Sequence, residues 1–266
     1  MLHPTAIIDS RAKLDGSVSV GPYAVIDGPV EIGPGCVIGP HVHITGHTRI
    51  GAHNRFFTGA VIGEAPQDLK YTGEPSGLRI GDYNTFREHV TVHRANHAGS
   101  ETIIGSKVLL MAHCHIAHDC QLGNGIIIAN GALLGGHVVV DDRALISGNC
   151  LLHQFVHVGT LAIMQGGSAI SKDLPPYTIA RGDNGICGLN TVGLRRAAIS
   201  SADRIELRKL YHFVFRGDLN IRDAAAEAQK QFHGPMARTM LEFIANSKRG
   251  VCADVRRKSE PDEEEE

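Results

Sequence analysis

The sequence predicts an all-β parallel β-helix, a prism of short stacked strands, followed by a small α-helical domain. Three observations carry this prediction. A bulky apolar residue recurs every six positions from Ile8 to Ile170, and 25 of the 28 positions in the series hold one. Glycine or aspartate often follows that residue, and a small residue often precedes it by two positions. After about residue 180, helical spacing replaces the period of six. A six-residue period fits neither an α-helix nor simple alternation and is typical of a parallel β-helix.

Each six-residue unit, or hexad, is expected to form a short strand and a sharp corner. The bulky side chain points into the prism, and glycine or aspartate tolerates the backbone angles of the turn. Three hexads make one triangular coil, so residues 18 apart in the sequence lie above one another. Prisms of this kind wind left-handed, against the usual right-handed preference of parallel crossovers. The predicted fold class is therefore a left-handed parallel β-helix over residues 1–180.

The repeat is interrupted twice, and each interruption is predicted to be a loop that leaves the prism. The loops span residues 64–77 and 94–102, and the only breaks in the apolar series, at Asp68, Glu74 and Ala98, fall inside them. Long loops on a rigid scaffold commonly carry function. A solvated surface excursion is the alternative interpretation.

The repeat ends near Pro175–Pro176, and the remaining chain has helical character. A helix is expected to open at Ser201, with Ile205, Leu207 and Leu210 spaced for one apolar face. Two more helices are expected at about residues 221–232 and 236–248. The predicted division is an α-helical C-terminal domain over 181–258 and a disordered acidic tail over 259–266.

Composition limits the class of protein. The net charge of −2 gives no support for nucleic-acid binding, and the apolar runs are too short for a membrane span. The N-terminus lacks the basic and apolar segments of a secretory signal. The six cysteines form no C-x-x-C pair and are expected to be reduced thiols. These features predict a soluble, cytoplasmic protein.

Stacking positions one coil apart brings polar side chains together at one corner. The triplet 117–119 is expected to lie beneath 135–137, and that triplet beneath 153–155. The polar residues of this column are His118, Asp119, His137, His153 and Gln154. His115 lies on the strand that leads into the same corner. The column is a candidate active site.

The residue types in this column suit acyl transfer. His118 is a candidate general base, and the adjacent carboxylate of Asp119 is placed to fix its tautomer. Gly136, one coil above, leaves its backbone N–H open to approach and is a candidate oxyanion donor. Moving an acyl group onto a hydroxyl requires both functions.

Two other interpretations of the histidines stay open at this point. They are polar corner residues facing water, or they bind a metal. The spacing His113-x4-His118 resembles the ligand spacing of γ-class carbonic anhydrases, which share this fold and hold a catalytic zinc. A catalytically inert scaffold is a further possibility.

Five segments carry a resemblance to a known family. They are QDLKY at 67–71, HIAHDC at 115–120, GGHVVVDD at 135–142, HQF at 153–155 and DLPPY at 173–177. With them the chain resembles the acyl-carrier-protein:UDP-N-acetylglucosamine O-acyltransferases of lipid A biosynthesis over nearly its whole length. The pair HIAHDC and QDLKY is specific to this family among hexapeptide-repeat proteins.

The resemblance implies a homotrimer of left-handed prisms with active sites between neighbouring subunits. The implied reaction moves a 3-hydroxyacyl chain from acyl carrier protein to the 3-hydroxyl of UDP-N-acetylglucosamine, with no metal or redox cofactor. His118 would be the general base, Asp119 would orient it, and the Gly136 N–H would hold the oxyanion. Another hexapeptide acyltransferase, with a 3-amino sugar acceptor or an acyl-CoA donor, is the alternative.

The resemblance also assigns residues to the substrates. The implied substrate-binding residues are Gln67, Asp68, Lys70, His93, His115, His137, His153, Gln154, Asn190 and Arg196. Gly166 matches the position that sets acyl length, where a small residue implies a chain of about 14 carbons. Val192 and Ala197 replace residues that are commonly acidic and basic in the family, which bears on affinity for nucleotide or carrier protein.

Overall fold

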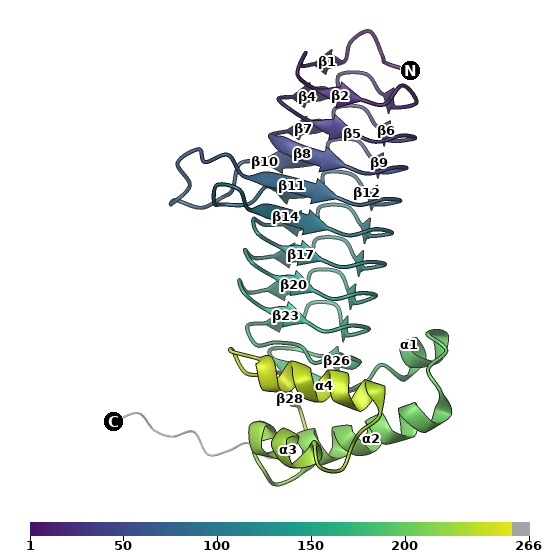
Figure 1. The fold of residues 1–266 in the computed structure, drawn as a ribbon, viewed down its shortest axis with the longest axis vertical. Coiled ribbons are helices and arrows are strands. Elements are labelled where there is room, and N and C mark those ends of the chain that lie inside the picture. Colours follow the sequence, from purple (N-terminus) through teal and green to yellow (C-terminus); the bar gives the residue numbers. More distant parts are fainter. Residues whose placement is uncertain (257–266) are drawn as a thin grey trace.

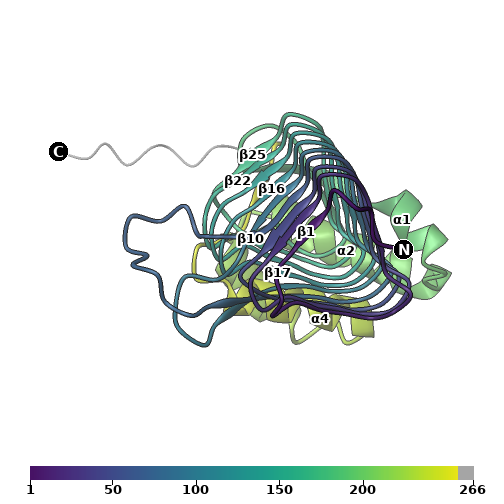
Figure 2. The same ribbon diagram turned by 90° about the horizontal axis from the view of Figure 1, so that it is seen from above.

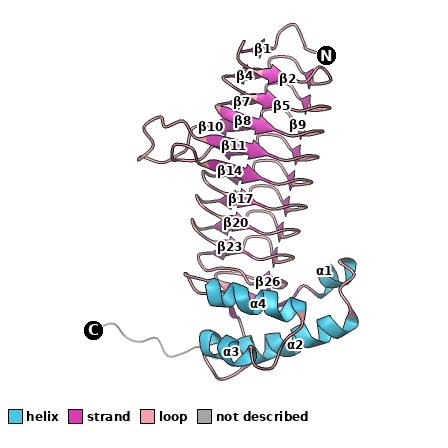
Figure 3. Ribbon diagram, in the orientation of Figure 1, coloured by secondary structure: helices cyan, strands magenta, loops and turns pink. Residues whose placement is uncertain are grey.

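A stack of triangular coils forms most of the molecule in the computed structural model, which describes residues 1–256 (Figure 1). Seen along the stack, the coils superimpose as a triangle, with one pair of loops projecting from a corner (Figure 2). The helices gather at the C-terminal end of the stack (Figure 3). The predicted parallel β-helix with a following helical domain is confirmed. The predicted acidic tail at 259–266 lies outside the described residues.

Three sheets of nine, eight and eleven strands form the sides of the prism. The first sheet contains β1 (Ile7–Ile8), β4 (Val25–Asp27), β7 (His43–Thr45), β10 (Val61–Glu64), β13 (Thr91–His93), β16 (His115–Ile116), β19 (Leu133–Leu134), β22 (Leu151–Leu152) and β25 (Ala169–Ile170). The second contains β2 (Lys13–Leu14), β5 (Glu31–Ile32), β8 (His47–Ile50), β11 (Gly77–Ile80), β14 (Glu101–Ile104), β17 (Gln121–Leu122), β20 (Val139–Val140) and β23 (His157–Val158). The third contains β3 (Ser19–Val20), β6 (Val37–Ile38), β9 (Arg55–Phe56), β12 (Thr85–Phe86), β15 (Leu109–Leu110), β18 (Ile127–Ile128), β21 (Leu145–Ile146), β24 (Ile163–Met164), β26 (Thr178–Ala180), β27 (Gly185–Leu189) and β28 (Ala253–Asp254).

The strand register confirms the predicted coil of three hexads. His115 pairs with Leu133, and Leu133 pairs with Leu151, each exactly three hexads further along the chain. At the two interruptions, Val61 pairs with Thr91, and Thr91 pairs with His115. The first of these coils is longer by two hexads and the second by one. Because each insertion is a whole number of hexads, the prism keeps its phase beyond both loops.

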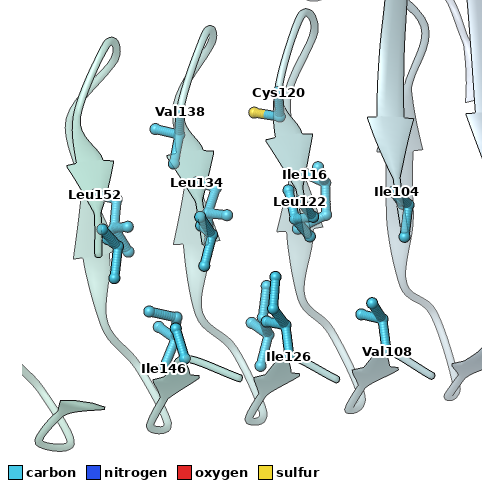
Figure 4. Packing of buried hydrophobic residues seen from close by; sticks show 14 of the residues in the cluster. Ile104, Val108, Ile116, Cys120, Leu122, Ile126, Leu134, Val138, Ile146 and Leu152 are labelled. Atoms are coloured by element: carbon cyan, nitrogen blue, oxygen red, sulfur yellow. The ribbon is translucent and has the colours of Figure 1, made fainter. Parts of the chain in front are cut away.

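The bulky residue of each hexad fills the prism interior. Ile26, Ile62 and Ile116 have no exposed surface, and Figure 4 shows Ile116, Leu134 and their neighbours from successive coils stacked inside the walls. Burying each such side chain contributes about 1.5–3 kcal/mol. Cys120 also fills the core, and burial raises the pKa of its thiol to about 12, which suits a packing residue and not a nucleophile.

The helical end of the molecule differs in detail from the sequence prediction. Its helices are α1 (Thr191–Arg196), α2 (Ser201–Arg216), α3 (Ile221–Ala228) and α4 (Pro235–Asn246). The short α1 was not predicted, because so short a helix has too few turns to show an apolar period. The third sheet also continues beyond residue 180: β27 pairs antiparallel with β26, and β28 returns from beyond α4 to pair with β27.

A buried carboxylate joins that returning strand to the helices. Asp254 accepts hydrogen bonds from the Tyr211 hydroxyl at 2.6 Å and the Arg216 Nε at 2.8 Å. These contacts, together with the β27–β28 pairing, fix the helical end to the prism. No helix in the described part of the chain has the length and apolar character needed to cross a membrane.

Candidate active site

A histidine and an aspartate form a close pair in the turn between β16 and β17. The Nδ1 of His118 lies 2.8 Å from the Oδ2 of Asp119, and their side chains are only 12% and 11% exposed. An ionised carboxylate only accepts hydrogen bonds, so Nδ1 carries the proton and Nε2 is left as a free base. The backbone of Asp119 has a φ of 58°, and its N–H donates to Thr102 Oγ1 at 2.8 Å.

Gly136 lies directly against the free edge of the His118 ring. A Cβ at this position would be 2.7 Å from both Nε2 and Cε1 of His118, closer than real Cβ contacts. Only glycine therefore leaves the imidazole undisturbed. Among the described residues, no acceptor is paired with the Gly136 backbone N–H. A glycine with an unpaired N–H thus lies against the imidazole, at the corner where the stacking of the coils predicted it.

His137 and Phe155 extend the same corner into the next coils. The His137 Nε2 lies 3.9 Å from Asp119 Oδ2, and its ring meets the His118 ring edge-on at 5.3 Å between centroids. Phe155 stacks on the other face of His137 at 4.5 Å. Burial lowers the pKa of His137, against the opposing attraction of the Asp119 carboxylate.

His115 and His93 form a second pair of rings on the same sheet. Their centroids are 4.8 Å apart in an edge-on arrangement, and Thr91 Oγ1 lies 2.8 Å from His115 Nδ1. Burial lowers the pKa of both rings, that of His93 to about 4. His93 is 5% exposed, and its Nδ1 has no hydrogen-bond partner within residues 1–256. His93 is thus a buried imidazole whose neutral form is favoured by its surroundings.

Burial of neutral His93 makes folding depend on pH. The unfolded chain binds a proton at His93 below about pH 6.5, whereas the folded chain binds it only near pH 4. Between these values the unfolded state holds more protons, so stability falls as pH falls. We expect His93→Gln to reduce the fall in the free energy of unfolding between pH 7 and pH 4 by up to about 3 kcal/mol. The measurement is chemical denaturation at the two pH values.

The exposed His47 provides the control for that experiment. His47→Gln should leave the difference between pH 7 and pH 4 as in the wild type, because the ring lies at the surface of β8. Equal pH dependence in the wild type and in His93→Gln would show that His93 does not titrate on unfolding. Protein concentration is held constant, since any self-association contributes to apparent stability.

The two loops reach the His118–Asp119 pair through a residue that the sequence did not single out. Asn96 of the second loop donates its backbone N–H to Asp119 Oδ2 at 3.0 Å. Its side-chain Nδ2 donates to Asp68 Oδ2 at 2.7 Å. Asp68 also accepts the Lys70 backbone N–H, the main cause of its lowered pKa. The predicted loop residue Asp68 is therefore joined to Asp119 by one intervening residue, Asn96.

An apolar groove opens beside the pair on the first sheet. Its volume is about 640 Å³, and its lining includes His115, His153, Leu133, Leu151 and Ile170. Leu133 and Leu151 are 44% and 50% exposed, which is high for residues of this size. Asp183 and Asn184 also line the groove. It offers an apolar wall with imidazoles at its edge.

The remaining predicted residues lie apart from His118 in a single chain. Gln67, Lys70 and Gln154 are exposed, and within the described residues their side chains form no hydrogen bond or ion pair with His118 or Asp119. Asn190 is buried as the N-cap of α1, accepting from the Gly193 N–H and donating to the Leu161 carbonyl, both at 2.8 Å. Its side chain therefore has a structural role within its own chain. Arg196 is exposed at the end of α1.

Gly166 lies at another corner, in the turn between β24 and β25. Residues Ala169 and Ile170 of β25 line the apolar groove, so this turn leads into its wall. A Cβ on Gly166 would meet only the Gly148 carbonyl oxygen, at an ordinary 3.5 Å. The position therefore has room for a side chain.

The structure places the two histidines of the metal-site alternative in different turns. His113 stacks on His89 at 5.2 Å in the turn between β15 and β16, whereas His118 lies in the next turn, between β16 and β17. The group in the described chain with metal-ligand spacing is instead His118, Asp119 and His137, whose donor atoms lie within 4.8 Å of one another. The carboxylate atom of that group already accepts the Asn96 N–H.

Comparison with family models places the chain in the class of hexapeptide-repeat transferases. The model "Bacterial transferase hexapeptide (six repeats)" matches residues 11–46 and 101–136. The model "Udp N-acetylglucosamine O-acyltransferase; Domain 2" matches residues 173–252. The two models thus account for parts of the prism and nearly all of the helical end.

Individual relatives define the family. The acyl-[acyl-carrier-protein]–UDP-N-acetylglucosamine O-acyltransferase of Halorhodospira halophila is 47% identical over 253 residues, which cover 94% of this chain and 98% of that protein. The enzyme of the same name from Thermodesulfovibrio yellowstonii is 44% identical over 94% of this chain and 98% of its own length. The solved UDP-N-acetylglucosamine acyltransferase of Bacteroides fragilis superimposes with a TM-score of 0.91 at 40% identity, covering 94% of this chain and 99% of that one. The chain therefore belongs to the acyl-[acyl-carrier-protein]–UDP-N-acetylglucosamine O-acyltransferase family and is an acyltransferase.

Proposed function

We propose that this acyltransferase moves a 3-hydroxyacyl chain from acyl carrier protein to the 3-hydroxyl of UDP-N-acetylglucosamine, the first step of lipid A biosynthesis. Family membership supports the two substrates. The observation that carries the chemistry is the 2.8 Å contact between His118 and Asp119, with the free Nε2 against the backbone of Gly136. The apolar groove beside this pair suits the hydrocarbon part of the donor.

The proposed mechanism uses only groups of the chain. His118 Nε2 removes the proton of the sugar 3-hydroxyl as its oxygen attacks the thioester carbonyl, and Asp119 stabilises the resulting imidazolium. The Gly136 N–H donates to the oxyanion of the tetrahedral intermediate. When that intermediate collapses, the carbon–sulfur bond breaks, and the proton on His118 passes to the departing thiolate of the carrier.

We propose that the complete site forms between subunits of a homotrimer of left-handed prisms. One chain supplies His118, Asp119 and Gly136 together, with Asp68 nearby, whereas the exposed Arg196 and Gly166 and the buried Asn190 lie in other parts of the chain. A neighbouring prism that packs against the first sheet would supply such residues. Gln67, Asp68 and Lys70 would contact the nucleotide sugar, and His93, His115, His137, His153 and Gln154 would line the cleft.

The test is a product assay by mass spectrometry. Purified protein is incubated with UDP-N-acetylglucosamine and a panel of 3-hydroxyacyl carrier proteins, and the linkage of the product is determined. A 3-O-acylated sugar nucleotide is the expected result. Product only with acyl-CoA, or only with the corresponding 3-amino sugar nucleotide, would replace the proposed substrates while leaving an acyltransferase.

Gly166 gives a prediction about chain length. We expect wild-type protein to prefer a chain of about 14 carbons and Gly166→Met to prefer a shorter one, because each methylene denied burial forfeits about 0.8 kcal/mol. Thermal stability should change little, since only the Gly148 carbonyl lies near an added Cβ, at 3.5 Å. An unchanged profile across the donor panel would remove Gly166 as the length-determining residue.

We further propose that the reaction needs no metal. Prolonged treatment with a chelator and removal of the chelator by gel filtration should leave the rate within about twofold, because the His118–Asp119 pair supplies the base directly. Elemental analysis of the same sample checks that metal is absent. Loss of activity that added zinc restores would point instead to a metal held by His118, Asp119 and His137.

A further inference from the structure

Asn96 joins the two parts of the proposed site, and no role has been given to it so far. It belongs to the second loop between β13 and β14, and its side chain is 4% exposed. Its backbone N–H donates to Asp119 Oδ2, the same atom that faces His118 Nδ1. Its side-chain Nδ2 donates to Asp68 Oδ2 at 2.7 Å, across to the first loop. One residue therefore contacts two carboxylates with two different donors.

The two contacts have separate consequences. The backbone N–H contact with Asp119 is independent of residue type and survives any substitution except proline. The side-chain contact with Asp68 needs a donor of this length and polarity, because the Asp68 carboxylate only accepts. Hydrogen bonds between a neutral donor and a charged group are among the stronger ones in proteins. The side chain of Asn96 therefore determines where the Asp68 carboxylate is held.

The other contacts of Asp68 do not fix it alone. The Lys70 backbone N–H reaches its second oxygen at 2.9 Å, but that contact is internal to the first loop. It fixes the carboxylate relative to its own loop and not relative to the prism. Arg94 also ties the loops together, through the Gly63 carbonyl and the Tyr71 hydroxyl, without touching Asp68. The Asn96 amide is the link between Asp68 and the catalytic turn.

We propose that Asn96 is a positioning residue that holds Asp68 at a set place relative to the His118–Asp119 pair, and so controls affinity for the sugar nucleotide. This inference rests on the proposed function, in which Asp68 contacts that substrate. It predicts an effect on substrate binding and not on the chemical step, because the backbone contact with Asp119 is retained when the side chain changes.

The test is a double-mutant cycle of Asn96→Ala and Asp68→Ala, with kcat and KM measured for each variant. We expect Asn96→Ala to raise KM for the sugar nucleotide about tenfold, the loss typical of a hydrogen bond to a charged group, with kcat within about threefold. KM for the acyl carrier protein should stay within about twofold. In the Asp68→Ala background, Asn96→Ala should change KM less than about twofold, because its partner is gone.

Asn84→Ala is the matched control, since Asn84 is an equally buried amide bound to the Gly105 carbonyl and the Val108 N–H at another corner. It should lower stability without changing KM. Asn96→Asp is nearly isosteric and serves if the alanine variant does not fold. It should raise KM at least as much as alanine does, because it places a carboxylate against Asp68.

Three results would overturn the proposal while wild-type activity is intact. They are a full KM effect of Asn96→Ala in the Asp68→Ala background, a fall in kcat at constant KM, or an Asn96→Asp variant with wild-type KM. Failure of the proposed function is a different result, because the wild type itself would then give no acylated sugar nucleotide.

Discussion

Replacement of His118 by alanine is expected to lower kcat by about 10²–10⁴-fold, the usual contribution of a positioned general base. The imidazole is the only group of the described chain whose basic nitrogen lies against Gly136, and Asp119 fixes its tautomer at 2.8 Å. KM should change little, because the loss falls on the transition state. The measurement is the rate of formation of the acylated sugar nucleotide by mass spectrometry.

Two further measurements make that result specific. His47→Ala removes an exposed imidazole from β8 on the second sheet and should leave the rate unchanged. Asp119→Asn keeps the size of the carboxylate partner but no longer favours the imidazolium, so it should also lower kcat without affecting the fold. Activity of His118→Ala near the wild-type rate would exclude His118 as the base and favour another mechanism or a scaffold role.

The prism and the core of the site were predictable because the hexad rule is local and repeats. A bulky residue at every sixth position fixes which side chains point inward, and the three-hexad coil then fixes which corners coincide. That arithmetic alone placed Gly136 above His118. It worked across both interruptions because each insertion is a whole number of hexads and keeps the phase.

The contacts of the loops escaped prediction because they lie outside that repeat. Asn96 is 28 residues from Asp68 and 23 residues from Asp119 in the sequence, and neither separation is a multiple of the six-residue period. In the sequence, Asn96 is one polar residue in a loop without a repeating pattern, so nothing distinguishes it from its neighbours. The N-cap role of Asn190 likewise gives no periodic signal in the sequence, and the substrate contact that its family match implies stays a prediction. In this chain its side chain caps α1 and is occupied at both ends.

The contacts of the second loop show what an insertion at this level of the prism adds to the site. The bare prism provides His118, Asp119 and Gly136 from its own turns, but their corner is open to solvent on one side. The second loop covers Asp119 with the Asn96 N–H and the Ser100 hydroxyl at 3.0 and 3.3 Å. Partial exclusion of water strengthens the interaction between the carboxylate and the imidazole.

A methyl group on Gly136 is expected to reduce kcat by about 10²–10³-fold, although alanine keeps the backbone N–H. The added Cβ would lie 2.7 Å from Nε2 and Cε1 of His118, so either the backbone at residue 136 or the imidazole ring must move. The imidazole is held by Asp119 on one edge and meets the His137 ring on another, so moving it weakens the 2.8 Å contact. Product formation and thermal unfolding are measured on the same sample.

Gly16→Ala separates this clash from the general effect of alanine in such a turn. Gly16 follows Leu14 by two residues as Gly136 follows Leu134, but no atom lies within 4 Å of its Cβ position. Gly16→Ala should retain full activity.

The His118→Ala background then distinguishes two causes of the Gly136→Ala effect, displacement of the base and obstruction of the substrate. If the methyl group acts by displacing His118, Gly136→Ala should lower kcat by less than a further factor of about three in that background. The effects of two residues that act through the same group are not additive, and here the imidazole is already absent. An undiminished effect in that background would mean that the methyl group blocks the substrate directly, and that the space above His118 is where the acceptor hydroxyl lies.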